Sequence, residues 1–121
     1  MVEFGSIVLT HFPFTDLTGT KLRPALVISR GNERRHDIVL AFITSNLNTQ
    51  NADSLRLEPS RSNGLKAPSL VRFDKIVTLE KRVIVGELGR VDAEFLNQAA
   101  PVFFGVFGFY DYSGPTPVPT R

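Results

Sequence analysis

The 121-residue sequence contains no cysteine and only two histidines, His11 and His36. Without cysteine, the chain cannot form a disulfide bond, use a thiolate nucleophile, or bind zinc or an iron–sulfur cluster through thiolates. The two histidines are far apart in the sequence, and neither lies in a metal-ligand pattern such as HxH or HExxH. We therefore expect no metal ion or other cofactor, so that any hydrolytic chemistry proceeds without metal.

The sequence also lacks a long hydrophobic run and a strong excess of one charge. No apolar stretch approaches the roughly 20 residues that cross a membrane, and no N-terminal segment resembles a secretion signal. We therefore expect a cytoplasmic protein with no membrane partner. Fourteen Lys and Arg against twelve Asp and Glu leave a net charge of +2, too small to indicate a nucleic-acid partner from bulk electrostatics. Any basic binding site must be local.

The length and the composition indicate one domain with a single core. Hydrophobic residues make up 42% of the chain and charged residues 21%, as is typical of an ordinary globular domain. We expect this domain to cover residues 1–110. Residues 111–121, which are rich in proline and have little to bury, are expected to form a disordered tail. The segment before the tail is expected to belong to the core or to a dimer interface, and it contains Phe103, Phe104, Phe107 and Phe109.

Short runs rich in Val, Ile, Leu and Phe, separated by polar turns, predict β-strands over most of the chain. The runs cover residues 6–12, 24–29, 37–45, 54–57, 69–73, 75–79 and 83–87. Runs 6–12 and 37–45 have apolar residues on both faces, which is typical of central strands. The fold class is therefore expected to be mainly β, as a small antiparallel barrel or sandwich.

A helix is predicted near the C-terminus. Asp92 is suited to the N-cap position and Glu94 to the first turn, near the positive end of the helix dipole. Apolar residues then recur at spacings of three and four, and this stripe is able to seal an open end of a barrel. The stripe consists of Phe95, Leu96, Ala99, Val102, Phe103 and Val106. Pro101 lies inside it and predicts a kink or a restart, because proline within a helix costs about 3 kcal/mol.

Two neighbouring strand ends carry the residues best suited to chemistry. Arg23 starts the second predicted strand, whereas Thr44 and Ser45 end the third. These two strands are expected to form an antiparallel hairpin, so that Arg23 and Thr44 meet at the same edge of the sheet. A hydroxyl-rich loop at 15–21 and an Asn-rich loop at 46–53 lie beside them, and both are expected to be flexible and exposed to solvent.

Several blocks of sequence lie around these residues, namely GSIVL (5–9), FPFTD (12–16), RPALVIS (23–29), ITS (43–45), LKAPS (65–69), VRFDKI (71–76) and LGRV (88–91). Together they resemble the MazF/PemK family of ribonuclease toxins. Each block alone is a weak signal. Their shared order and plausible separations over roughly the first hundred residues make the resemblance specific.

The resemblance implies an SH3-like barrel with a C-terminal helix, a homodimer, and the toxin role in a type II toxin–antitoxin system. It also implies sequence-selective cleavage of single-stranded RNA without metal. In that reaction the ribose 2′-hydroxyl attacks the adjacent phosphate, leaving a 2′,3′-cyclic phosphate and a 5′-hydroxyl. A cognate antitoxin is an expected partner, as an acidic and partly disordered segment that covers the basic loop region.

Arg23 and Thr44 match active-site positions of the family and are the predicted catalytic residues. A guanidinium donates two parallel hydrogen bonds to phosphate oxygens and keeps its proton, so Arg23 suits transition-state stabilisation and is a poor general base. Thr44 would bond a phosphate oxygen or the 2′-hydroxyl. Without the resemblance, the favoured interpretation is a surface Arg23 paired with Asp16 or Glu33 and a Thr44 that is an ordinary strand residue.

The sequence leaves the proton carrier open. Leu22 cannot carry a proton, although some members of the family have a charged residue at its position. His11, where related sequences tend to have Asp, titrates near neutral pH, but a lone histidine in a strand is more often structural. Asp16 and Lys21, on the loop that can close over the substrate, are the other two alternatives.

RNA-binding residues are expected on the same two loops. Phe14 is the aromatic residue best placed to stack on a base, with core packing as its alternative. Thr18, Thr20, Ser45 and Asn46 are the expected polar contacts to RNA. Ser45 has no His or Asp near it in the sequence that would activate it as a nucleophile.

Two functions of other classes stay open as alternatives. Toxins that bind a protein target such as DNA gyrase share this barrel and have no catalytic site of their own. Their tryptophan-containing C-terminal ending is absent, because this chain has no Trp. A catalytically inactive RNA-binding relative is the other alternative, and the departures from the family pattern at Leu22 and His11 favour it.

Overall fold

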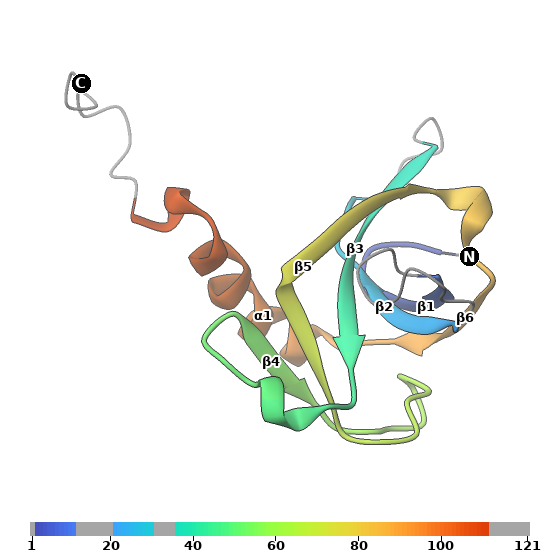
Figure 1. Cartoon of the computed structure of the whole chain (residues 1–121), viewed down its shortest axis with the longest axis horizontal. Coiled ribbons are helices and arrows are strands. Elements are labelled where there is room, and N and C mark those ends of the chain that lie inside the picture. Colours follow the sequence, from blue (N-terminus) through green and yellow to red (C-terminus); the bar gives the residue numbers. More distant parts are fainter. Residues whose placement is uncertain (1, 12–20, 31–35, 112–121) are drawn as a thin grey trace.

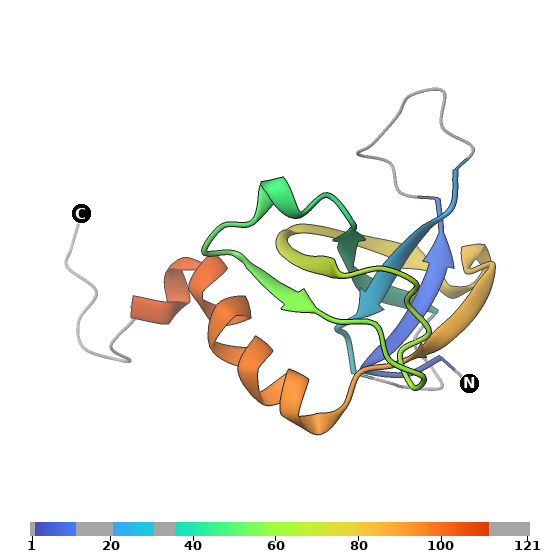
Figure 2. The same ribbon diagram turned by 90° about the horizontal axis from the view of Figure 1, so that it is seen from below.

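The computed structural model describes residues 2–11, 21–30 and 36–111. In these residues, an antiparallel sheet curls into a half-barrel and one helix packs against it (Figures 1 and 2). The strands are β1 (Ser6–Thr10), β2 (Arg23–Val27), β3 (Asp37–Thr44), β4 (Ser54–Leu57), β5 (Ser69–Glu80) and β6 (Gly86–Arg90). Their order in the sheet is β4-β5-β3-β2-β1-β6. The predicted mainly-β class is confirmed.

One α-helix and three 3₁₀ helices complete the described chain. They are α1 (Ala93–Val106), η1 (Leu47–Thr49), η2 (Lys81–Val83) and η3 (Gly108–Asp111). None of the helices in the described ranges is long and apolar enough to cross a membrane. The tail expected over 111–121 lies outside the described residues except for Asp111, which ends η3.

Both faces of the central strands are buried, because each face supports its own core. The helix-side core contains Ile7, Leu26, Ala41, Ile43, Leu57, Val71, Phe73, Val91, Phe95 and Ala99. The second core, on the other face of the same strands, contains Val8, Ala25, Val27, Ile38, Leu40 and Phe42. Alternate residues of β1, β2 and β3 therefore belong to different cores, as the period of two in a strand requires. The prediction that β1 and β3 are central strands is confirmed.

The two strands predicted at 69–73 and 75–79 form a single strand, β5, of 12 residues. The pairing of β3 with β5 shifts between two neighbouring residues, because Ala41 lies opposite Ile76 whereas Phe42 lies opposite Arg72. Residues 73–75 therefore form a bulge, and Figure 1 shows β5 bending about half-way along its length. The polar Asp74 suggested a break in the strand, but it lies in this bulge. The prediction of two separate strands was wrong for that reason.

The last strand begins later than the sequence indicates. The apolar run at 83–87 predicted a strand, but Val83 ends η2 and β6 begins at Gly86. The backbone N–H of Ile84 donates to the carbonyl of Lys81 and closes the 3₁₀ turn. Val83 and Val85 are exposed, so this run of β-branched residues does not mark a buried strand.

Helix α1 begins and packs as the sequence predicts, but it does not restart at Pro101. The Asp92 carboxylate accepts a hydrogen bond from the backbone N–H of Phe95 at 2.8 Å, which confirms the N-cap. The apolar stripe packs on the helix-side core through Phe95 and Ala99. Pro101 is exposed, and so is Asn97, whose carbonyl loses its helical partner. Water can bind that carbonyl, so the helix continues through the proline.

The segment between β4 and β5 is folded around one buried amide, Asn63, and is joined to β6 where the N–H of Arg90 donates to the carbonyl of Ser62 at 2.8 Å. The Asn63 side-chain oxygen accepts from the N–H groups of Ser60 and Leu65, at 3.0 and 2.9 Å. Its amide nitrogen donates to the carbonyl of Glu58 at 2.8 Å. A Cβ atom at Gly89 would lie 2.2 Å from the carbonyl oxygen of Ser62, so this close approach requires glycine.

We expect Asn63→Ala to lower the free energy of unfolding by about 2 kcal/mol, because a buried side chain loses its three hydrogen bonds to the backbone of Glu58, Ser60 and Leu65. Urea denaturation followed by circular dichroism measures the change. Asn97→Ala, on the exposed side of α1, is the matched control and should change the free energy by about 0.5 kcal/mol or less. Equal stability of the two variants would contradict the structural role of Asn63.

Candidate active site

Arg23 lies at the start of β2 between two threonines. Along the β1–β2 pair, Thr10 stands directly opposite Arg23. Along the β2–β3 pair, the last paired residues at this end are Ala25 and Phe42. Continuing this register by two residues places Arg23 across from Thr44. All three side chains belong to the face of the second core, because they alternate with residues of the helix-side core.

The hydrogen-bonded ladder between β2 and β3 stops just before Arg23 and Thr44. Pro24 stands at this point and has no N–H to donate. In the described chain, the strand ends beyond it are therefore not joined by a backbone pair. A guanidinium and a hydroxyl at such an opening can both turn toward one ligand, and phosphate oxygens suit both of them as acceptors.

The hydroxyl of Thr44 is oriented by the backbone that follows it. Its Oγ1 accepts a hydrogen bond from the N–H of Asn46 at 3.1 Å, so its own proton is left to donate. The side-chain oxygen of Asn46 accepts from the N–H of Asn48 at 3.1 Å, and the hydroxyl of Thr49 donates to the carbonyl of Asn46 at 2.9 Å. The Asn-rich segment thus begins as a set of linked turns that caps η1.

The other predicted site residues fall in three places. His11 and Lys21 are exposed at the open ends of β1 and β2, and Ser45 is exposed directly after Thr44. Asn46 is also exposed, and because its oxygen is engaged, its amide nitrogen is the group left for a ligand. Four further predicted residues lie outside the described part of the chain, namely Phe14, Asp16, Thr18 and Thr20.

A charged pair that the sequence reasoning missed lies on the same face. The guanidinium of Arg72 donates two hydrogen bonds to the carboxylate of Asp74, each of 2.9 Å. The two side chains are only 12% and 26% exposed. Arg72 stands opposite Phe42, and Thr44 stands opposite Leu70 on the same strand pair. Arg72 is therefore the diagonal neighbour of Thr44, at about 7–8 Å between Cα atoms.

This pair differs in burial from other ion pairs of the structure. Three pairs with much more exposed side chains are Arg56–Glu58, Arg82–Glu80 and Arg90–Glu3. The sequence held one signal for this pair, since Arg72 and Asp74 are two residues apart in an apolar run. That spacing puts two side chains on one face of a strand.

The Arg72–Asp74 contact sets the charge state of both groups. Hydrogen bonding from Arg72 lowers the pKa of Asp74 below its ordinary range, although partial burial opposes this. The hydrogen bond to Asp74 raises the pKa of Arg72, and the nearby charge of Asp53 acts in the same direction. Asp74 is thus an ionised carboxylate at neutral pH, and its lowered pKa makes it a weaker base than a free carboxylate.

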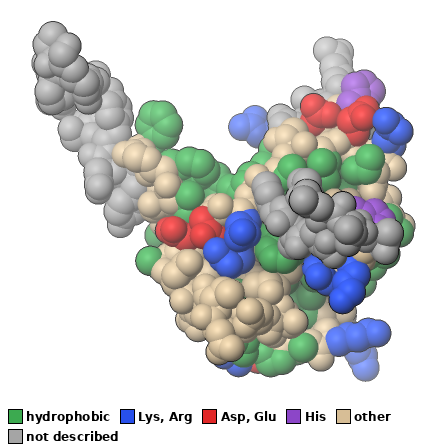
Figure 3. All heavy atoms as spheres, viewed as in Figure 1, with side chains coloured by type: hydrophobic (Ala, Val, Ile, Leu, Met, Phe, Trp, Pro, Cys, Tyr) green, Lys and Arg blue, Asp and Glu red, His purple; other side chains and the backbone are tan. Residues whose placement is uncertain are grey.

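Charge is local rather than spread over the surface. On the face seen in Figure 3, Lys and Arg side chains form separate groups instead of one continuous basic patch. Within the described ranges, no group of three or more His, Asp or Glu side chains lies close enough together to hold a metal ion. Any binding of a polyanion must therefore use a few defined contacts.

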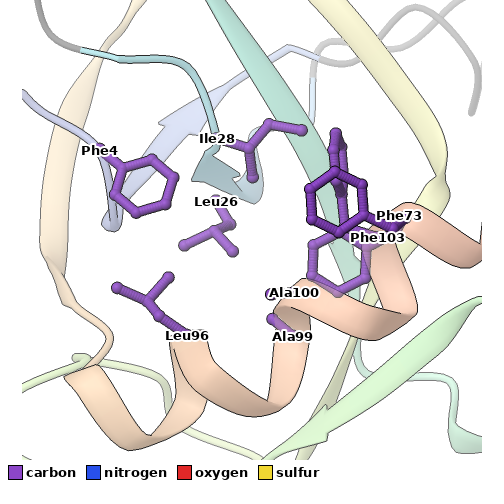
Figure 4. A pocket seen from close by; sticks show the side chains of 9 residues that line it. Phe4, Leu26, Ile28, Phe73, Leu96, Ala99, Ala100 and Phe103 are labelled. Atoms are coloured by element: carbon purple, nitrogen blue, oxygen red, sulfur yellow. The ribbon is translucent and has the colours of Figure 1, made fainter. Parts of the chain in front are cut away.

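An apolar pocket of about 240 Å³ lies on the opposite side of the sheet, beside α1. Figure 4 shows its side chains converging from α1, from β2 and from the N-terminal segment, and they include Phe4, Leu26, Ile28, Leu96 and Phe103. Phe104 lines its rim and is 55% exposed, whereas Phe109 is 78% exposed. The expectation that the Phe-rich end belongs to the core was wrong for Phe104, Phe107 and Phe109, because all three are exposed.

The curled sheet with a single helix at its end is similar to the fold of several solved toxin structures. An endoribonuclease in complex with its cognate antitoxin, from a mycobacterial species, has a TM-score of 0.70 and 22% identity, over 88% of this chain and 94% of that one. The Mycobacterium tuberculosis toxin MazF-mt6 has a TM-score of 0.69 and 21% identity, over 84% and 95%. The MazE–MazF complex of Deinococcus radiodurans has a TM-score of 0.67 and 22% identity, over 88% and 95%. At these identities, the likeness establishes the fold.

The family is established by the sequence. The model of the PemK-like, MazF-like toxins of type II toxin–antitoxin systems matches residues 3–102. The chain belongs to this family, and it is therefore the toxin of such a system. A search of curated proteins finds no match to the chain. The family resemblance and the curled barrel with a C-terminal helix, both expected from the sequence, are confirmed.

The Arg72–Asp74 pair should make stability depend on pH. The pKa of Asp74 is lower in the folded state than in the unfolded chain, so the pair stabilises the fold above about pH 3.9. This stabilisation is lost as the pH falls through the lower folded-state value. We expect the stability difference between wild type and Asp74→Asn to be largest near neutral pH and to shrink in acid.

Urea denaturation between pH 7 and pH 3 measures that difference. Glu58→Gln, which removes the carboxylate of an exposed ion pair, is the control and should show little pH-dependent effect. A difference for Asp74→Asn that stays constant with pH would contradict the assignment of a lowered pKa to Asp74.

Proposed function

We propose that the protein is an endoribonuclease that cleaves single-stranded RNA sequence-selectively and without metal. The observation that carries the proposal is the placement of Arg23 across from Thr44, at strand ends where the β2–β3 ladder has stopped. The partly buried Arg72–Asp74 pair on the same face adds a second cation, held in place by its carboxylate. Solved relatives of the same fold that are endoribonucleases support the same activity.

Arg23 acts on the transition state. When the 2′-oxygen attacks phosphorus, the phosphate becomes pentacoordinate and gains negative charge, which a guanidinium stabilises by bidentate hydrogen bonds. The Thr44 hydroxyl donates a hydrogen bond to a phosphate oxygen, because its own oxygen already accepts one from the N–H of Asn46. Neither group needs to gain or lose a proton for these roles.

Proton transfer needs a carrier besides Arg23 and Thr44. The 2′-hydroxyl gives its proton to a base, the O2′–P bond forms and the P–O5′ bond breaks, which leaves a 2′,3′-cyclic phosphate, and the departing 5′-oxygen takes a proton from an acid or from solvent. The exposed His11 and Lys21 at the neighbouring strand ends are candidate carriers, and so is Asp16, which lies outside the described residues. Asp74 instead holds Arg72 on the face of the site.

The RNA substrate would be held by a few contacts around this site. The amide nitrogen of Asn46 and the hydroxyl of Ser45 are exposed donors beside Thr44. Phe14, Thr18 and Thr20 are proposed as further RNA contacts from the β1–β2 loop. Recognition of unpaired bases suits such scattered donors, because single-stranded RNA exposes its base edges.

We further propose that two copies of the chain associate and that a cognate antitoxin binds the dimer. The exposed Phe104, Phe107 and Phe109 beside the apolar pocket form the largest group of exposed aromatic side chains among the described residues. Such a surface is costly in water and favours association. Relatives solved with their antitoxins support an antitoxin partner.

The nuclease proposal is tested by incubating the protein in EDTA with a long unstructured RNA and mapping the 5′ ends of the fragments. We expect discrete cuts with 5′-hydroxyl and cyclic-phosphate ends. Arg23→Ala should slow cleavage by about 10² to 10³-fold, because it removes one preorganised donor to the transition state. His11→Ala, measured in the same assay, decides whether this residue carries a proton, because its loss would then flatten one limb of the pH–rate profile.

Arg61→Ala removes an exposed arginine of the β4–β5 segment and is the matched charge control, with cleavage expected at the rate of the wild type. Folding of each variant is checked by circular dichroism. Absence of cleavage by the folded wild type on several RNAs would overturn the nuclease proposal.

The dimer proposal is tested by light scattering after size exclusion. We expect the wild type to have the mass of two chains, and the double variant Phe104→Asp/Phe107→Asp to have the mass of one, because buried unpaired charges oppose association. Val85→Asp, which places the same charge at an exposed apolar residue of the β6 edge, should leave the dimer intact. A wild type with the mass of one chain would refute the proposed interface.

A further inference from the structure

Thr10 is the residue that no part of the proposed mechanism uses, although it is the nearest strand neighbour of Arg23. It ends β1, its side chain is 1% exposed, and it stands directly opposite Arg23. Directly opposite residues of an antiparallel pair have Cβ atoms about 4.5–5.5 Å apart. The buried side chain of Thr10 therefore packs against the base of the Arg23 side chain.

Arg23 depends on this neighbour because it has no other strand partner among the described residues. The pairing of β2 with β3 ends at Ala25 and Phe42, two residues before Arg23. The pairing of β1 with β2 continues to Thr10 and Arg23. The start of β2 is thus held from the β1 side alone.

Thr10 is in turn anchored by its hydroxyl. The pairing of β1 with β6 ends at Leu9 and Gly86, and the N–H of Val85 donates to the carbonyl of Leu9 at 2.9 Å. One residue further along β1, a side chain makes the next hydrogen bond in place of a backbone N–H. The Thr10 hydroxyl donates to the carbonyl of Val83 at 3.3 Å. This hydrogen bond ties the end of β1 to η2.

We propose that Thr10 is a positioning residue for Arg23. Its methyl group and its hydroxyl have separate roles, since the first packs against Arg23 and the second fixes Thr10 to η2. With the hydroxyl removed, the end of β1 loses its link to η2 and the Arg23 guanidinium samples more orientations. The catalytic consequence rests on the proposed nuclease function, whereas the ordering of Arg23 does not.

The test compares Thr10→Val, which keeps the shape and loses the hydroxyl, with Thr10→Ser, which keeps the hydroxyl. Thr10→Val should lower kcat for a defined RNA by about tenfold with little change in KM, because small displacements of a catalytic group cost rate. Thr10→Ser should restore most of the rate. In the Arg23→Ala background, measured in single turnover, Thr10→Val should cause no further loss.

The order of the Arg23 side chain is measured separately, without RNA, by NMR relaxation of its Nε–H group. It should fall in Thr10→Val and be restored in Thr10→Ser. Ser29→Ala is the matched control, because Ser29 is another buried hydroxyl bonded to the backbone, at 3.0 Å from the N of Val39. It should lower stability and leave both kcat and the order of Arg23 unchanged.

Three results would overturn the role of Thr10. The first is an unchanged order of the Arg23 side chain in Thr10→Val. The second is a loss of kcat in Ser29→Ala equal to that in Thr10→Val. The third is a further tenfold loss of rate when Thr10→Val is added to Arg23→Ala. If the folded wild type cleaves no RNA, the nuclease proposal fails. The NMR measurement then still decides whether Thr10 positions Arg23.

Discussion

The site depends on where the backbone hydrogen bonds between β2 and β3 stop. Pro24 cannot donate a hydrogen bond, and the ladder ends at Ala25 and Phe42, so the strand ends that carry Arg23 and Thr44 are free of it. Polar side chains can gather at such an opening without breaking the sheet. Thr10 on one side and the turn after Thr44 on the other then limit how far these ends can move.

The two cores make this arrangement rigid. Because β1, β2 and β3 bury residues on both faces, a slip of one residue would exchange the two sets of side chains, and the register is strongly specified. The helix covers one face, and the half-barrel closes around the other. The chemistry-bearing groups on this second face are therefore displayed by strands that cannot shift independently.

A net charge of +2 does not attract RNA by itself, and the structure concentrates its useful charge instead. Arg72 is held by Asp74 within a bulge of β5, partly buried and next to the strand that ends at Thr44. The bulge matters because it turns a polar interruption of the strand into a fixed ion pair on the face of the site. A local arrangement of this kind suits a few defined phosphate contacts, as the proposed function requires, rather than attraction of any polyanion.

The sequence by itself determined the strand-rich class, the central strands, the helix with its cap at Asp92, and the family, because hydrophobic period, capping residues and motif blocks are all local signals. It also predicted Arg23 and Thr44 together, since a hairpin brings its strand ends to one edge. The continuity of β5, the late start of β6 and the pairing of Arg72 with Asp74 were decided only by the tertiary structure. These features depend on how strands that are distant in the sequence pair with each other. They also depend on which apolar residues are covered by other parts of the fold. The exposure of Phe104 and Phe109 has the same origin, because no local pattern distinguishes a phenylalanine that packs inside from one that stays on the surface.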